Sequence, residues 1–218
     1  KTAKAVPAKT AAGKRVEVNL AVGYLAANQV ESDLRLDVHS ASVRAAGTKG
    51  RLVIDAGSGA VRVEDATGEL DVDTGSGSTT LVGLRMTNVK VDAGSGSTDA
   101  RDVQAVRFSV DVGSGSVTAD ALTTDDLHLD TGSGSVRVEL TKAPGRTSID
   151  TGSGSVSLTL PADLAADLDI ETGSGGISSD FPVTMEGYQR RELRGRIGAG
   201  GPLIKVSTGS GGVRLLKR

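Results

Sequence analysis

The tripeptide Gly-Ser-Gly occurs eight times in this chain of 218 residues, at nearly regular intervals. Successive copies lie 18, 19, 19, 19, 20, 21 and 36 residues apart, and their first glycines are Gly57, Gly75, Gly94, Gly113, Gly132, Gly152, Gly173 and Gly209. A unit of about 19 residues is too short to bury its own apolar face, so it becomes stable only when copies of it stack. The repeat therefore restricts the chain to an elongated architecture of stacked coils.

Alternating apolar and polar residues flank each glycine corner. Apolar side chains stand five and three positions before the first glycine, as Leu127 and Leu129 do, and resume four and six positions after it, as in Val136 and Val138. This alternation is typical of strands with one buried and one solvent-facing side. We predict an all-β fold, a single elongated parallel β-helix or β-solenoid of about nine or ten coils with about 19 residues per coil.

The domain boundaries follow from where this register holds. Residues 1–15 are rich in Lys, Ala and Thr and are expected to form a polar N-terminal segment or linker, whereas residues 16–218 are expected to form the solenoid domain. The last interval, of 36 residues, is close to two periods. It therefore predicts one coil that lacks a Gly-Ser-Gly corner.

Composition limits the chemistry that the chain can use. It contains no Cys, its aromatic content is 2%, and its net charge is −2. Disulfides are thus excluded, and the narrow core must be filled by Val, Leu, Ile and Ala. The charge balance gives no reason to expect nucleic acid as a partner. No apolar run is long enough to cross a bilayer, so membrane attachment is expected only through a segment absent from this chain.

An acidic residue recurs two positions before the first glycine of most copies. Stacked coils would place these carboxylates about 5 Å apart, and the repulsion between neighbours must be offset. Either each carboxylate accepts hydrogen bonds from the amides of its corner, or the ladder binds a row of cations such as calcium. We favour the turn cap, because calcium-binding nonapeptide repeats place the acid after the glycines. The candidate cation ladder is Asp55, Asp73, Asp92, Asp111, Asp130 and Asp150.

Catalytic motifs are weak in this sequence. Asp-Thr-Gly-Ser, which begins at Asp73, Asp130 and Asp150, resembles the aspartic protease motif, but here it is the repeat consensus. The two histidines, His39 and His128, are expected to be solvated surface residues. We therefore expect no catalytic residues and no cofactor.

A charged segment interrupts the repeat between the last two corners. A cluster of this kind can bind a carboxylate, a phosphate or a sugar, although it is also typical of a solvated loop. If the chain has a local ligand site, we expect it at Tyr188, Arg190, Arg191, Arg194 and Arg196.

Three segments together resemble the DUF4097 family of bacterial candidate adhesins. They are Asp130–Val138, with the sequence Asp-Thr-Gly-Ser-Gly-Ser-Val-Arg-Val, the segment Ile197–Pro202, and Val206–Val213. The resemblance covers roughly residues 34–215. It implies a β-solenoid outside the cytoplasm, at the cell envelope or surface, with no established catalytic residues.

These observations lead to one main functional hypothesis and two alternatives. We expect a non-enzymatic scaffold of the cell envelope that acts as an interaction or adhesive surface for an envelope protein or glycan. One alternative is a β-helix that binds or cleaves polysaccharide. The other is a structural solenoid that self-assembles through its ends into a homo-oligomer.

Overall fold

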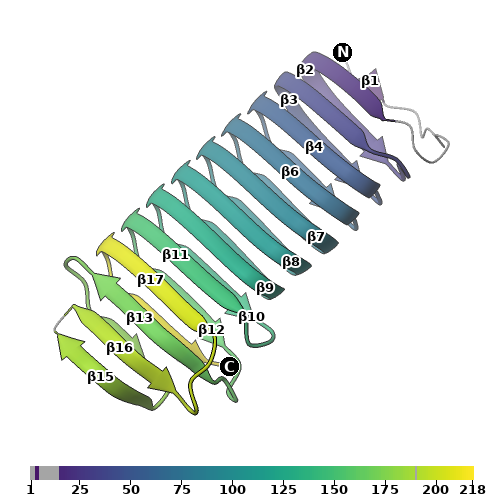
Figure 1. Cartoon of the computed structure of the whole chain (residues 1–218). Coiled ribbons are helices and arrows are strands. Elements are labelled where there is room, and N and C mark those ends of the chain that lie inside the picture. Colours follow the sequence, from purple (N-terminus) through teal and green to yellow (C-terminus); the bar gives the residue numbers. More distant parts are fainter. Residues whose placement is uncertain (1–2, 5–14, 190) are drawn as a thin grey trace.

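The computed structural model describes residues 3–4, 15–189 and 191–218. These residues form the predicted all-β parallel solenoid, with about eight turns of about 19 residues each (Figure 1). The predicted segment 1–15 lies almost wholly outside the described residues. The first long strand begins at Val16.

The strands are β1 (Ala3–Lys4), β2 (Val16–Asn28), β3 (Leu34–Ala46), β4 (Lys49–Ser58), β5 (Val61–Glu64), β6 (Thr67–Ser76), β7 (Thr79–Ser95), β8 (Thr98–Ser114), β9 (Val117–Ser133), β10 (Val136–Leu140), β11 (Arg146–Ser153), β12 (Val156–Leu160), β13 (Ala166–Thr172), β14 (Ile177–Ser179), β15 (Val183–Gln189), β16 (Glu192–Ile197), β17 (Leu203–Ser210) and β18 (Val213–Lys217).

Each coil pairs in parallel with its equivalent in the next coil. The register between β7 and β8 matches Val89 with Phe108 and Ser95 with Ser114, and β8 and β9 continue it. The apolar residues that the alternation places inward are buried, and Phe108 is the largest of the fully buried side chains. Small branched side chains fill the rest of the narrow interior, as the composition requires.

The order of strands changes at the C-terminal end. Strand β17 lies between β11 and β13 and is parallel to both, as Figure 1 shows. In the same way, β18 pairs with β12 on one side and with β14 on the other. The chain thus completes the coil 166–179, continues past it, and returns to insert its last two strands one position back in the stack.

The prediction of a coil without a glycine corner in the 36-residue interval is wrong. The interval contains a hairpin of β15 and β16, in which β16 pairs antiparallel with β13. Antiparallel neighbours need only a tight turn, whereas a parallel coil needs a full circuit. Because a hairpin takes the place of a coil, the expected nine or ten coils exceed the number observed, about eight.

Candidate functional site

The glycine corners are required by the stacking of the coils. A Cβ on the first glycine of a corner would lie 2.7 Å from the carbonyl oxygen of the preceding coil, as for Gly94 against Gly75. The third glycine has a positive φ, 148° at Gly134, and its Cβ would overlap the Gly115 oxygen. Both glycines thus serve close backbone approach, and the third also needs the left-handed conformation.

Threonines that precede the corner help to hold it. The Thr131 hydroxyl donates to the Gly115 oxygen at 3.1 Å, and the Thr151 hydroxyl donates to the Gly134 oxygen at 3.2 Å. Both threonines are buried. The hydroxyl therefore acts inside the structure and is not part of an outward array.

The acidic ladder forms an unbroken outward column. The strand registers pair each aspartate with the next, first from β3 to β7 and then to β11. After Asp150 the inserted β17 contributes Ser207, and Glu171 follows it. The acidic column consists of Asp37, Asp55, Asp73, Asp92, Asp111, Asp130 and Asp150.

Burial and neighbouring like charges disfavour the ionised form of two members of the acidic column. Partial burial, followed by the charges of Asp111 and Asp150, raises the pKa of Asp130 above its ordinary value. Burial and the charges of Asp92 and Asp55 raise the pKa of Asp73 in the same way.

Neither the turn cap nor the cation ladder that the sequence suggested has the expected contacts in the described part of the acidic column. Among the residues that the structure describes, these carboxylates accept no backbone hydrogen bond, so the predicted turn cap is not observed. The corner carbonyls are bound by threonine hydroxyls instead. The described part of the column also brings no three carboxylates close enough together to share one cation.

One group of three carboxylates in the described ranges does meet that criterion, and it lies at the C-terminal hairpin. Ligand oxygens of Asp169, Glu171 and Glu192 all lie within 4.8 Å of one another. The Arg194 guanidinium lies among them, 2.7 Å from Glu192, 3.3 Å from Asp169 and 3.4 Å from Glu171. The charges of Glu192 and Asp169 raise the pKa of Arg194. The Arg194 guanidinium thus offsets part of the negative charge of this acidic group.

The ligand patch predicted from the sequence is divided between different environments. Arg194 is held by the three carboxylates, and Arg196 pairs with Glu186 at 2.6 Å. Arg191 is exposed in the turn between β15 and β16. Tyr188 lies in β15 opposite Leu193. Arg190 lies outside the described residues. Two of the five residues are therefore engaged in ion pairs within the hairpin region.

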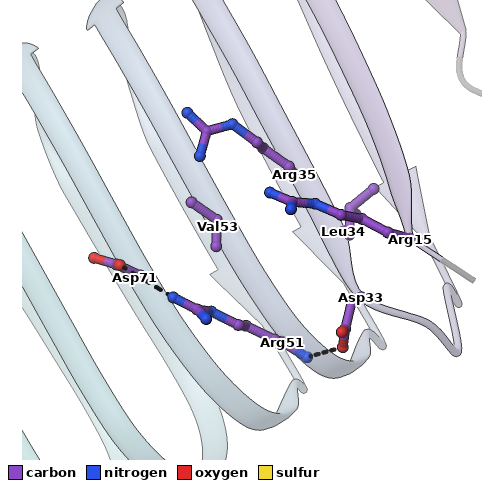
Figure 2. A pocket seen from close by; sticks show the side chains of 7 residues that line it. All are labelled: Arg15, Asp33, Leu34, Arg35, Arg51, Val53 and Asp71. Atoms are coloured by element: carbon purple, nitrogen blue, oxygen red, sulfur yellow. Dashed lines mark hydrogen bonds and ion pairs between the residues drawn. The ribbon is translucent and has the colours of Figure 1, made fainter. Parts of the chain in front are cut away.

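A pocket near the N-terminal end, which the sequence analysis did not predict, gathers three arginines. Arg15, Arg35 and Arg51 line a cavity of about 200 Å³ around Val53 (Figure 2). Two carboxylates share the pocket: Asp33 accepts a hydrogen bond from the Arg51 amide at 3.0 Å, and Asp71 lies 3.9 Å from the Arg51 guanidinium. The sequence signal for it is an alternation of charge at intervals of 18 residues, in Arg15, Asp33, Arg51 and Glu69. Asp55 also lies 3.9 Å from the Arg35 guanidinium, so acids face two of the three arginines and offset much of the positive charge of the pocket.

A comparison of the sequence with protein-family models finds a match that spans the repeat. A family model described as Toastrack DUF4097 matches residues 24–216, which include all of the glycine corners. Neither curated proteins nor solved structures give a match to the chain. Since the family model covers most of its length, the chain belongs to the Toastrack DUF4097 family.

Proposed function

We propose that the chain is a non-enzymatic interaction scaffold of the cell envelope, located outside the cytoplasm, that binds an envelope protein or glycan through the flat sides of its solenoid. The observation that carries this proposal is the acidic column with its neighbouring serines, which repeat in register from coil to coil. Such an array presents the same chemical group about every 4.8 Å. It is suited to a long or repetitive partner more than to a small substrate.

The described polar residues support binding more than catalysis. His128 stands between Ser109 and Ser148 in an outward column and close to Asp130, yet no hydrogen bond joins these side chains in the described ranges. Polysaccharide cleavage needs an acid and a base set around a cleft. The pKa values of Asp73 and Asp130 are raised by burial and by neighbouring aspartates, but both residues stand in an outward column of the solenoid with no base hydrogen-bonded to them among the described residues.

The ends of the solenoid favour a single scaffold over end-to-end assembly. At one end the antiparallel hairpin of β15 and β16 extends the sheet beyond β13, so the outermost strand there is the hairpin strand β15 and not a strand in the register of the coils. The pairing of β15 with β16 is interrupted by a register shift between Met185 and Gly187, and an irregular edge strand of this kind disfavours pairing with another chain.

The described part of the chain contains no helix that could span a membrane.

The test uses the purified full chain and isolated envelope polymers of the host. We expect saturable co-sedimentation with a polymer, no release of reducing or unsaturated ends, and a constant monomer mass in sedimentation analysis. Cellulose, a neutral polymer of similar extended shape, is the control for non-specific binding. The proposal fails if the chain binds no envelope fraction above this control, or if polymer ends accumulate with time.

A further inference from the structure

A second cavity, distinct from the arginine pocket, lies on the side of the solenoid that follows the glycine corners. Its volume is about 250 Å³, and residues of β9, β10, β12 and β18 contribute to its lining. The side chains used here are Ser116, Ser135, Ser155, Ser157, Arg137 and Arg214, which we call the Ser/Arg groove.

Two arginines lie in one column of the Ser/Arg groove. Arg137 pairs in register with Ser157, and Ser157 pairs with Arg214 on the inserted strand β18. The two arginines are therefore two strand spacings apart, about 10 Å, on either side of a hydroxyl. Both are exposed, and neither forms an ion pair with any described residue.

The serines of the groove form a second column beside the arginines. Their backbone groups are used in stacking, since the Ser135 oxygen accepts from Val117 at 3.0 Å and the Ser155 oxygen accepts from Val136 at 2.9 Å. Their hydroxyls are largely free: the Ser116 hydroxyl accepts one bond from the Ser135 amide at 3.4 Å. The hydroxyls of Ser135 and Ser155 have no partner in the described part of the chain.

The electrostatic setting separates this groove from the arginine pocket. No carboxylate lines it. The acid two positions beyond Arg137, Glu139, is paired with Arg218 at 3.4 Å. Two uncompensated guanidiniums therefore face a row of hydroxyls, which is the donor set that recognises an oxyanion on a polyhydroxylated molecule.

The geometry points to a binding site for an acidic polysaccharide in the Ser/Arg groove, an inference that rests on the scaffold function proposed above. The guanidiniums of Arg137 and Arg214 hold carboxylate or phosphate oxygens, and the serine hydroxyls bind the sugar hydroxyls. The polymer runs along the stacking direction, because an extended acidic chain repeats at an interval close to that of the strands. With so few aromatic side chains available, the affinity depends mainly on charge and falls as salt is added.

The experiment measures binding of the full chain to oligogalacturonate, which carries carboxylates, to phosphomannan, which carries phosphates, and to a neutral β-glucan. We expect one or both acidic polymers to bind and the neutral one not to bind. Either Arg137→Gln or Arg214→Gln should weaken binding about tenfold, and the double variant about a hundredfold. Arg101→Gln is the matched control, because Arg101 is also exposed on β8 and unpaired among the described residues, and it should bind as the unmodified chain does.

The possible failures are distinguishable. If the unmodified chain binds an acidic polymer but the double variant binds it equally well, or if Arg101→Gln causes the same loss, the groove is not the site and the scaffold function stands. Equal binding of the neutral glucan also overturns the groove. If the chain binds none of these polymers and no envelope fraction, both the inference and the proposed function fail.

Discussion

At the scale of single residues, the third glycine of a corner is restricted both by its backbone conformation and by the neighbouring coil in seven of the eight corners. Gly134 combines a φ of 148° with a backbone oxygen where its Cβ would be. We expect Gly134→Ala to lower the free energy of unfolding by roughly 3 kcal/mol, because both a backbone strain and a steric overlap must be relieved. Urea unfolding measures the difference. Ser135→Ala, at the next and exposed position, should change stability by less than about 0.5 kcal/mol. Equal effects of the two variants would contradict the stacking role of this glycine.

A pH dependence follows from the acidic column. Since the native pKa of Asp130 is raised above its ordinary value of 3.8, its ionised form is less favourable in the folded chain than in the unfolded chain. The penalty is absent below that ordinary value and is complete once the pH has passed the native pKa. We expect Asp130→Asn to raise the thermal midpoint at neutral pH, with the difference vanishing in acid.

Asp163 provides the control for this pH experiment. It lies in the turn between β12 and β13, away from the acidic column. Asp163→Asn should leave the thermal midpoint nearly unchanged across the same pH range. If Asp130→Asn destabilises the chain at neutral pH, burial and like charge do not determine what the Asp130 carboxylate contributes to stability.

At the scale of elements, the C-terminal hairpin is joined to the solenoid by both backbone pairing and charge. Arg194 of β16 bridges to Asp169 and Glu171 of β13. We expect Arg194→Gln to increase hydrogen exchange over β15 and β16, because three carboxylates would be left close together without a cation. Arg191→Gln, in the exposed turn, is the matched control and should not change exchange. Unchanged exchange in Arg194→Gln would mean that backbone pairing alone holds the hairpin.

The strands beside the corners were predictable, but the position of the last ones was not. The alternation that places Val136 and Val138 inward is local, and every coil repeats it, so strand type and register follow from the sequence. The same alternation in Ile204 and Val206 fits any place in the stack. Which strand becomes the neighbour of β11 depends on the hairpin between β13 and β17, and no local pattern encodes that choice.

Among the candidate sites, those that depend on local spacing were predictable from the sequence, and those that depend on the inserted strands were not. The acidic column was predicted because each aspartate has the same offset from its own corner. The pairing of Arg137 with Arg214 across Ser157 was not, since sequence order would place Ser178 of β14 where the inserted β18 brings Arg214. Arg194, within the predicted ligand patch, is instead part of an ion-pair cluster because β16 runs antiparallel to β13.

At the scale of the whole molecule, we expect different regions of the stack to unfold independently. Coils in a solenoid contact only their neighbours. Removing one coil therefore destabilises the adjacent coils and leaves distant coils folded. Deletion of residues 203–218 removes the parallel partners of β13 and β14. We expect hydrogen exchange to become fast over residues 166–197 and to remain slow over residues 34–140.

The matched control for the deletion is the full chain with Lys205→Ala, an exposed position on β17, which should leave both regions protected. Retained protection of residues 166–197 in the shortened chain would contradict this prediction. It would mean that β13 pairs directly with β11 when the inserted strand is absent.

The insertion of β17 and β18 also has a consequence for synthesis. A nascent chain can stack its coils one after another as they emerge from the ribosome, up to β12. The coil 166–179 cannot take its final neighbours until residues 203–218 have been made, because those residues form the layer between it and β11 and β12. Residues 203–218 therefore complete the interior of the stack although they follow the coil 166–179 in the chain, and ribosome-bound chains that still lack them should have the coils up to β12 formed and the coil 166–179 without its parallel neighbours.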